Sequence, residues 1–326
     1  MAKAIVMRSP GGSEVLQLEQ VSIGEPGPGE VQLRQTAVGV NFHDVYVRSG
    51  LYRTLPLPGV PGIEAVGVVK AIGPGVTHVK VGERVGYVTS AYGAYADERL
   101  IAADLLIKLP DSVDDRTAAS MLVRGLTAEL LLYQVHKLQP GDVVLVHAAA
   151  GGVGRLLCQW AHHLGATVIG TVGSDEKARI ARDSGCDHVI LYRSENFVDR
   201  VRTITNGRGV DVAYDSVGKD TFLGSLDALA RLGHLVNFGQ ASGPVEPISM
   251  SQLAQKSNTV TRPIMFHYIA ERSRRDAMAA SLFKALADGV ITAGAYHEYR
   301  IEDVGRAHED MEARKTAGAV VLDTRA

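Results

Sequence analysis

Apolar residues form short runs along the chain, and the spacing of these runs changes near its middle. In the first third, runs at 4–7, 30–37, 64–72 and 84–88 are separated by turn sequences rich in Gly and Pro. Closely spaced runs of strand length with such turns predict a small β-rich domain. From 143 to about 262, strand-like and helix-like segments alternate, which predicts a doubly wound α/β domain with a parallel sheet.

The segment 143–177 has the clearest pattern. An apolar run at 143–147 precedes the sequence AAGGVG, and residues 156–164 continue at helical spacing before a second strand at 166–171. The six residues fill a G-x-G-x-x-G frame with alanine in the first glycine place. Such glycines let the backbone approach a pyrophosphate at the amino end of a helix, where free N–H groups favour an anion. The predicted pyrophosphate-binding residues are Ala149, Gly151, Gly152, Val153 and Gly154.

The end of the second strand indicates which nicotinamide cofactor is bound. An NAD site places a carboxylate about 20 residues beyond the glycines, but Gly173 stands there. Ser174, Lys177 and Tyr192 supply hydroxyl groups and a cation that suit the 2′-phosphate of NADPH. Asp175 opposes this interpretation, and a solvated lysine with an ordinary strand-end tyrosine is the alternative. We expect NADPH rather than NADH.

Weaker patterns fill the rest of the chain. Helices are expected at 117–135, 222–232 and 274–288, strands at 188–192, 210–215 and 234–238, and a strand-helix-strand unit is expected to end at 320–322. The cluster Arg272-Ser273-Arg274-Arg275 is expected to be a solvated helix start.

Composition limits the class of protein. At 326 residues, two domains or one large α/β unit are expected. A hydrophobic content of 46% excludes a disordered chain, and a net charge of −2 without a long basic run gives no sign of nucleic-acid binding. Because no signal peptide or membrane-spanning run is apparent, we expect a cytoplasmic protein without a membrane partner. Cys158 and Cys186 are too far apart in sequence to suggest a disulfide framework, and Cys158 is expected to be a buried thiol.

Five motifs together resemble the zinc-free quinone oxidoreductase, or ζ-crystallin-like, branch of the medium-chain dehydrogenase/reductase superfamily. They are NFHDVYVRSGLY at 41–52, HAAAGGVG at 147–154, IGTVGS at 169–174, YDSVG at 214–218 and VTRP at 260–263. The resemblance covers essentially the whole chain. It implies an α/β protein with a GroES-like catalytic domain at 1–122 and 265–326, a Rossmann NADPH-binding domain at 123–264, and a homodimer.

The chain lacks the residues that zinc needs. A catalytic zinc takes three protein ligands, and a structural zinc commonly takes four cysteines. In zinc-dependent relatives a Cys stands at the position of Asn41, and a His precedes Glu where this chain has Ile63 and Glu64. His43 and Asp44 form a neighbouring pair without a third ligand, and we expect helix-start and surface groups there. No metal is therefore predicted.

The resemblance also implies the residues around the nicotinamide and the substrate. The implied catalytic residues are Asn41, Asp44, Tyr46, Tyr52, Arg124, Thr127 and Arg262, and the implied ribose and nicotinamide wall is Ser216, Phe238 and Gly239. A tyrosine could hydrogen-bond a quinone oxygen or stack on its ring, although simple packing is the alternative for both tyrosines. Arg124 departs from close relatives, which tend to carry Lys, but keeps a charge for a phosphate or a substrate oxygen.

Without a metal, the chemistry rests on the nicotinamide, which donates hydride. The expected function is an NADPH:quinone oxidoreductase that acts on a small-molecule quinone. A reductase of the carbon–carbon double bond of alkenals or enones is the first alternative. A ζ-crystallin-like NADPH- and RNA-binding protein is the second, although the complete glycine turn and the ordinary charge argue against it.

Overall fold

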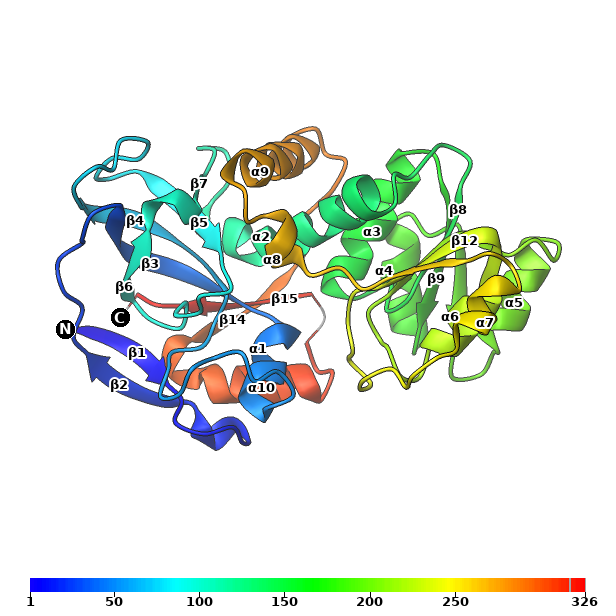
Figure 1. Ribbon diagram of the computed structural model, residues 1–326, viewed down its shortest axis with the longest axis horizontal. Coiled ribbons are helices and arrows are strands. Elements are labelled where there is room, and N and C mark those ends of the chain that lie inside the picture. The colour runs from blue at the N-terminus through cyan, green and yellow to red at the C-terminus, as the bar shows by residue number, and fades with distance from the viewer. Residues whose placement is uncertain (317, 326) are drawn as a thin grey trace. The chain divides into compact units, whose positions relative to one another are not determined.

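The computed structural model describes residues 1–316 and 318–325, and the chain divides into two compact units. The first unit comprises Met1–Val123, Ile269–Phe283 and Ala293–Ala326, and the second comprises Arg124–Tyr268 and Lys284–Thr292. Figure 1 shows the elements of both. Within the described residues, no helix is long and apolar enough to cross a membrane.

The first unit is built on a seven-stranded sheet. Its order is β14, β15, β3, β4, β5 and β7, with β6 also paired to β3, and β1 and β2 form a separate antiparallel pair. The strands are β1 (Ala2–Val6), β2 (Gln17–Val21), β3 (Glu30–Val40), β4 (Glu64–Ile72), β5 (Arg84–Val88), β6 (Glu98–Ala102), β7 (Leu106–Lys108), β14 (Tyr296–Arg300) and β15 (Ala319–Asp323). The pairs are antiparallel except β14 with β15. The GroES-like β architecture expected for this part of the chain is confirmed.

β3 delivers the chain to the first group of candidate site residues. Its side chains alternate between buried and partly exposed before a fully buried end, as a strand with one covered face requires. Helix α1 (Phe42–Ser49) begins one residue after β3 ends and stops at Gly50, which takes the left-handed conformation (φ 83°) that favours glycine. Asn41 therefore lies between a buried strand end and a helix start.

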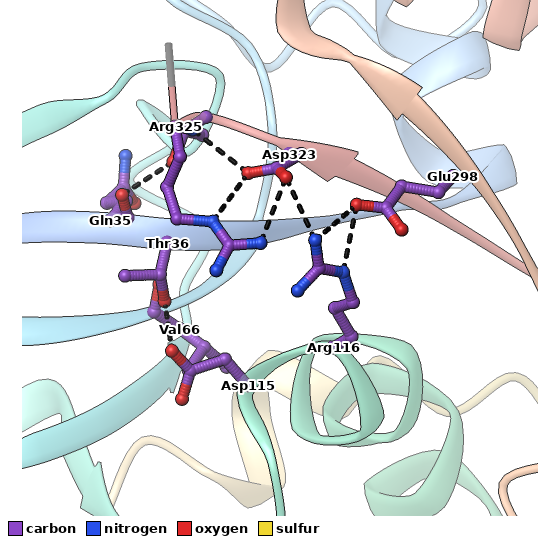
Figure 2. A network of polar contacts seen from close by, with 9 residues as sticks. Gln35, Thr36, Val66, Asp115, Arg116, Glu298, Asp323 and Arg325 are labelled. Carbon is purple, nitrogen blue, oxygen red and sulfur yellow. Dashed lines mark hydrogen bonds and ion pairs between the residues drawn. The ribbon is translucent and has the colours of Figure 1, made fainter.

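An ionic network ties the last strand to the rest of the first unit. Arg116, in the first turn of α2 (Asp115–Glu129), donates to Glu298 on β14 and Asp323 on β15 at 2.8 and 3.0 Å (Figure 2). The hydrogen bond from Arg325 is the main cause that lowers the pKa of Asp323 to about 2. These partly exposed pairs act as a network, which is worth more than isolated surface pairs.

The second unit contains a six-stranded parallel sheet in the order β10, β9, β8, β11, β12 and β13. Its elements are β8 (Val143–Val146), α3 (Gly152–His163), β9 (Thr167–Val172), α4 (Asp175–Asp183), β10 (His188–Leu191), α5 (Phe197–Ile204), β11 (Val210–Asp215), α6 (Phe222–Ala228), β12 (Leu229–Asn237), α7 (Met250–Ala254), β13 (Thr259–Thr261) and α8 (Met265–Tyr268). Numbered along the chain, the order is 3-2-1-4-5-6, the Rossmann order. The predicted Rossmann fold is confirmed.

Helices cover both faces of this sheet, with α3 and α4 on one side and α5 and α6 on the other (Figure 1). The core between the sheet and α5 and α6 includes Leu145, Ile169 and Leu235, none of which is exposed. The strand order reverses between β8 and β11, and in open α/β sheets ligands bind outside the carboxyl ends of the strands at this reversal.

One expectation about local structure is wrong, and a second is wrong at a single residue. The helix expected at 222–232 ends at Ala228, because Leu229 pairs with Val210 and opens β12. Sheet pairing here outweighs the helical spacing of the apolar residues. Helix α9 (Arg272–Ala287) begins at the basic cluster as expected, and Arg274 is exposed, but Arg275 is 1% exposed, and its guanidinium donates to the carbonyl oxygens of Ile269 and Asp104.

Candidate active site

The carboxyl edge of the six-stranded sheet gathers most of the predicted cofactor residues. The glycine turn follows β8, Gly173 follows β9, Tyr192 follows β10, Ser216 follows β11, Phe238 follows β12 and Arg262 follows β13. Residues separated by more than 100 positions therefore belong to one edge. This clustering was expected because parallel strands end on the same side.

The glycine turn after β8 is tight and strained. Ala148 takes a left-handed conformation (φ 52°), which is uncommon for a residue with a side chain. A Cβ at Gly154 would lie 2.2 Å from the carbonyl oxygen of Ala148, so glycine is required for α3 to start this close to the turn. The first N–H groups of α3 therefore lie close to the turn, and N–H groups at a helix start favour an anion.

Arg124 lies against this turn. A Cβ at Gly152 would lie 2.7 Å from Nε of Arg124, so the guanidinium occupies the space that a side chain there would take. Thr127, one helical turn further along α2, donates to Sδ of Met265 at 3.6 Å. A guanidinium beside the amino end of α3 suits a phosphate oxygen.

The predicted 2′-phosphate residues also lie together. A Cβ at Gly173 would lie 2.6 Å from the hydroxyl oxygen of Tyr192. Ser174 caps the start of α4, and its Oγ accepts the N–H of Lys177 at 3.3 Å, which leaves the serine hydroxyl proton available to a ligand. Tyr192 is exposed and Lys177 is half-buried, so both can reach a bound phosphate.

The residues of the predicted ribose and nicotinamide wall follow the ends of β11 and β12. Gly239 packs so closely on Ser216 that an added Cβ would lie 2.5 Å from the serine carbonyl oxygen. Asp215 is fully buried, and its Oδ1 accepts N–H groups at 2.8 and 3.0 Å from the turn that follows β11. Its Oδ2 has no hydrogen-bond partner among the described residues. Arg262 donates to the carbonyl oxygen of Asn237 at 2.9 Å.

In the first unit, Asn41 stands where zinc-dependent relatives carry a zinc ligand, and its side chain makes a hydrogen bond there. Asn41 donates to Oε1 of Glu64 at 2.7 Å, and the backbone N–H of Val123 donates to Oε2 at 2.7 Å. The amide replaces the thiolate that zinc requires, and no group of three His, Cys, Asp or Glu side chains in residues 1–316 and 318–325 is arranged to hold a metal. These residues do not fit a zinc ion.

Asp44 is a buried acid rather than a surface group, so the sequence expectation is wrong. Its side chain is 0% exposed, and Oδ2 accepts the N–H of Asn41 at 2.8 Å. Burial is the main cause that raises the pKa of Asp44 to about 7. A carboxyl group of this kind changes its charge close to neutral pH.

His43, Tyr46 and Tyr52 form an aromatic cluster with Tyr92. The rings of Tyr46 and Tyr52 meet edge-on with centroids 5.1 Å apart, and His43 meets Tyr52 at 5.5 Å. Nε2 of His43 lies 3.1 Å from the hydroxyl of Tyr92, which also contacts Thr54. Burial lowers the pKa of His43 to about 4, so the imidazole is neutral at pH 7. The cluster holds the two candidate tyrosine rings in fixed orientations.

Asp44→Asn should change how stability depends on pH. The folded pKa near 7 exceeds the usual value of about 3.9, so the native state binds the proton more tightly and stability falls as pH rises between these values. The neutral amide lacks this dependence. We expect the variant to be more stable than the wild type at pH 8, by on the order of 2 kcal/mol, and similar to it below pH 4. Chemical denaturation across pH checks this.

Asp111→Asn, at an exposed carboxyl, is the matched control and should leave the pH dependence unchanged. If Asp44→Asn and the wild type lose stability in parallel as pH rises, the raised pKa of Asp44 is wrong.

Three residues that position the site were missed from the sequence. Glu64 fixes Asn41, Tyr92 fixes His43, and His147 is held beneath the glycine turn. A carboxylate inside the apolar run at 64–72 was a usable signal for Glu64, because a buried charge requires partners. Nothing in the local sequence around Tyr92 indicates its contact, which joins segments 49 residues apart.

The glycine turn, the strand order and the clustered edge define a dinucleotide-binding enzyme fold. Residues 152–283 match the zinc-binding dehydrogenase family, and residues 27–111 match the alcohol dehydrogenase GroES-like domain. The chain is 45% identical to a quinone oxidoreductase of Pseudomonas aeruginosa and 45% identical to 2-haloacrylate reductase of a Burkholderia species, each over 99% of both chains. The crystal structure of Escherichia coli quinone oxidoreductase complexed with NADPH has a TM-score of 0.96 at 43% identity, covering 99% of this chain and 100% of that one. The chain belongs to the quinone oxidoreductase branch of the medium-chain dehydrogenase/reductase superfamily.

Proposed function

We propose that this protein is an NADPH-dependent quinone oxidoreductase. The observation that carries the proposal is the carboxyl edge of the six-stranded sheet, where a strained glycine turn, an adjacent guanidinium and a hydroxyl-lysine cluster lie at the ends of successive strands. Full-length relatives at 43–45% identity bear the same name, and one of them is solved with NADPH.

The residues present fit NADPH. Glycine at 154 lets α3 start close against the turn, and the N–H groups at that end of α3 supply donors for a pyrophosphate. Arg124 adds charge beside them, and Lys177 with Tyr192 takes the 2′-phosphate. Oδ2 of Asp215 offers a buried acceptor to a ligand hydroxyl. Bound NADPH supplies a hydride.

In this proposal, Tyr46 and Tyr52 bind the quinone. Each offers an apolar face that suits a planar ring and a hydroxyl that can donate to a quinone oxygen. Their edge-on contact with each other and the contact of Tyr52 with His43 fix the rings before substrate binds. Water shares the role of proton donor with these hydroxyls. Asn41, held by Glu64, presents a fixed amide on the same unit.

Tyr52→Phe should lower kcat for quinone reduction while leaving NADPH affinity nearly unchanged. The variant keeps the packed ring and removes only the hydroxyl, which is worth about 5- to 10-fold if it bonds the substrate. Steady-state kinetics with NADPH binding measured separately tests this. Tyr299→Phe, which removes a hydroxyl bonded to Asp310 in the same unit, is the control. An unchanged kcat in Tyr52→Phe would show that the hydroxyl does not bond the substrate and that Tyr52 serves only in packing.

A double-bond reductase is the second candidate, and the similarity to 2-haloacrylate reductase over 99% of both chains favours it. The two functions differ in the acceptor and not in the cofactor. Parallel assays of NADPH oxidation with 1,4-benzoquinone, 2-haloacrylate and a 2-alkenal separate them. Turnover of quinone without turnover of the alkenes supports the first proposal, and the reverse preference replaces it with the second.

The roles of the two domains, the oligomeric state, the location and the lack of a metal are also proposed. We propose that residues 1–122 and 265–326 act as the catalytic domain and residues 123–264 as the NADPH-binding domain. We further propose that the protein is a cytoplasmic homodimer that requires no metal. Size-exclusion chromatography with light scattering tests the dimer, and turnover that resists a chelator tests the lack of metal.

A further inference from the structure

A chain of hydrogen bonds lies next to the glycine turn, and the side chains that form it are not among the residues proposed to bind NADPH. Nδ1 of His147 lies 2.9 Å from Oγ1 of Thr171, and Nε2 lies 2.8 Å from Oγ of Ser225. His147 is 2% exposed, Thr171 is 1% exposed and Ser225 is 0% exposed, so water does not compete for these bonds. The chain joins the ends of β8 and β9 to α6.

The bonds around the ring determine which nitrogen of His147 carries the proton. Oγ of Ser225 also lies 2.8 Å from the carbonyl oxygen of Thr221, which can only accept. If Ser225 donates to that carbonyl, Nε2–H donates to Ser225 and the Thr171 hydroxyl donates to Nδ1, so all three protons are used. In the Nδ1–H tautomer, the hydroxyl proton of Thr171 has no acceptor among the other members of this hydrogen-bond chain. The Nε2–H form therefore satisfies more of the buried polar atoms.

The surroundings of the imidazole favour its neutral form. Burial has the larger effect and lowers the pKa of His147, although the buried carboxylate of Asp215 raises it, and the ring of Phe197 meets the imidazole edge-on with centroids 4.9 Å apart. A second proton, placed on Nδ1, would point at the Thr171 hydroxyl group, which already donates its own proton to Nδ1. The tautomer is thus held by packing and by hydrogen bonds at once.

His147 stands directly before the strained residue of the turn. Ala148 has φ 52°, and such strain persists only where the surrounding structure fixes it. The backbone N–H of His147 donates to Tyr214 at 3.1 Å, and that of Ala149 donates to Thr171 at 3.1 Å. Thr171 therefore holds both sides of Ala148, through its carbonyl oxygen on one side and its hydroxyl on the other.

We propose that His147 is a positioning residue for NADPH: its Nε2–H imidazole, fixed between Thr171 and Ser225, keeps the strained turn at Ala148 in the shape that receives the pyrophosphate. The inference rests on the proposed function only in taking NADPH as the ligand. It assigns a role in cofactor binding to a side chain that does not itself contact the cofactor.

A double-mutant cycle on NADPH affinity tests this positioning role. His147→Gln keeps a donor for Ser225 and loses the acceptor for Thr171, and Thr171→Val loses the donor without a change of shape. Each single variant should raise the Kd of NADPH, measured by fluorescence titration, about tenfold, and the double variant should be no weaker than either one. Thr171→Ser keeps the hydroxyl and should bind within about twofold of the wild type.

His234→Gln is the matched control, because it makes the same substitution at a histidine that bonds a threonine hydroxyl at 2.8 Å in the same sheet, on β12, two strands away from β8. It should leave the Kd unchanged. In ¹⁵N spectra of the imidazoles at pH 7.5, the signal that His147→Gln removes should report the neutral Nε2–H tautomer.

The possible failures can be told apart. A wild type that does not bind NADPH refutes the proposed function. A wild type that binds NADPH, with an unchanged Kd in both single variants, with effects that multiply in the double variant, or with an Nδ1–H signal, refutes the role of His147.

Discussion

Gly154→Ala should weaken NADPH binding by about 100-fold, because the new Cβ would lie 2.2 Å from the carbonyl oxygen of Ala148. The obstructing atom belongs to the backbone and cannot rotate away as a side chain can. Either α3 or the turn must move, and both supply the N–H groups proposed to bind the pyrophosphate. Fluorescence titration with NADPH measures the loss, and circular dichroism shows whether the variant folds.

Gly24→Ala provides the control, because an added Cβ there meets no atom within 4 Å. It should leave NADPH affinity unchanged. A folded Gly154→Ala protein that binds NADPH as tightly as the wild type contradicts the placement of the pyrophosphate at this turn.

Lys177→Ala should raise the Kd of NADPH about 10- to 100-fold and change the Kd of NADH little, because only the 2′-phosphate loses a charged partner. The structure places Lys177 on the first turn of α4, beside Ser174 and near the end of the strand that leads to Gly173. Titration of the variant with both cofactors gives the ratio directly.

Arg179→Ala is the matched control for Lys177→Ala, since it removes one cation from the same helix two positions away, on a different face. It should leave the preference for NADPH intact. Equal weakening of both cofactors by Lys177→Ala is the outcome that contradicts the phosphate assignment.

The cofactor unit was largely predictable from the sequence, for a physical reason. A parallel strand, a glycine turn and a helix are contiguous, so the local sequence specifies them, and the sheet then brings the other strand ends to the same edge. The strand at 210–215 has the bounds expected from its pattern, and Tyr192 lies beside Gly173 as the phosphate assignment requires.

The environment of the first unit was less predictable, because burial there depends on residues distant in the sequence. His43 and Asp44 look like helix-start groups in their local sequence, yet Tyr92 packs on His43, and Asp44 is fully buried. Cys158 and Cys186 illustrate the same limit. They are 28 residues apart, and the fold places their buried sulfur atoms 3.3 Å from each other.

Steady-state oxidation of NADPH with 1,4-benzoquinone tests the proposed quinone reductase activity, with NADH in place of NADPH in a second reaction and a chelator in a third. We expect rapid quinone-dependent oxidation of NADPH, much slower oxidation of NADH, and no effect of the chelator. Tight binding of NADPH without quinone turnover, or turnover that the chelator abolishes, would contradict the proposal.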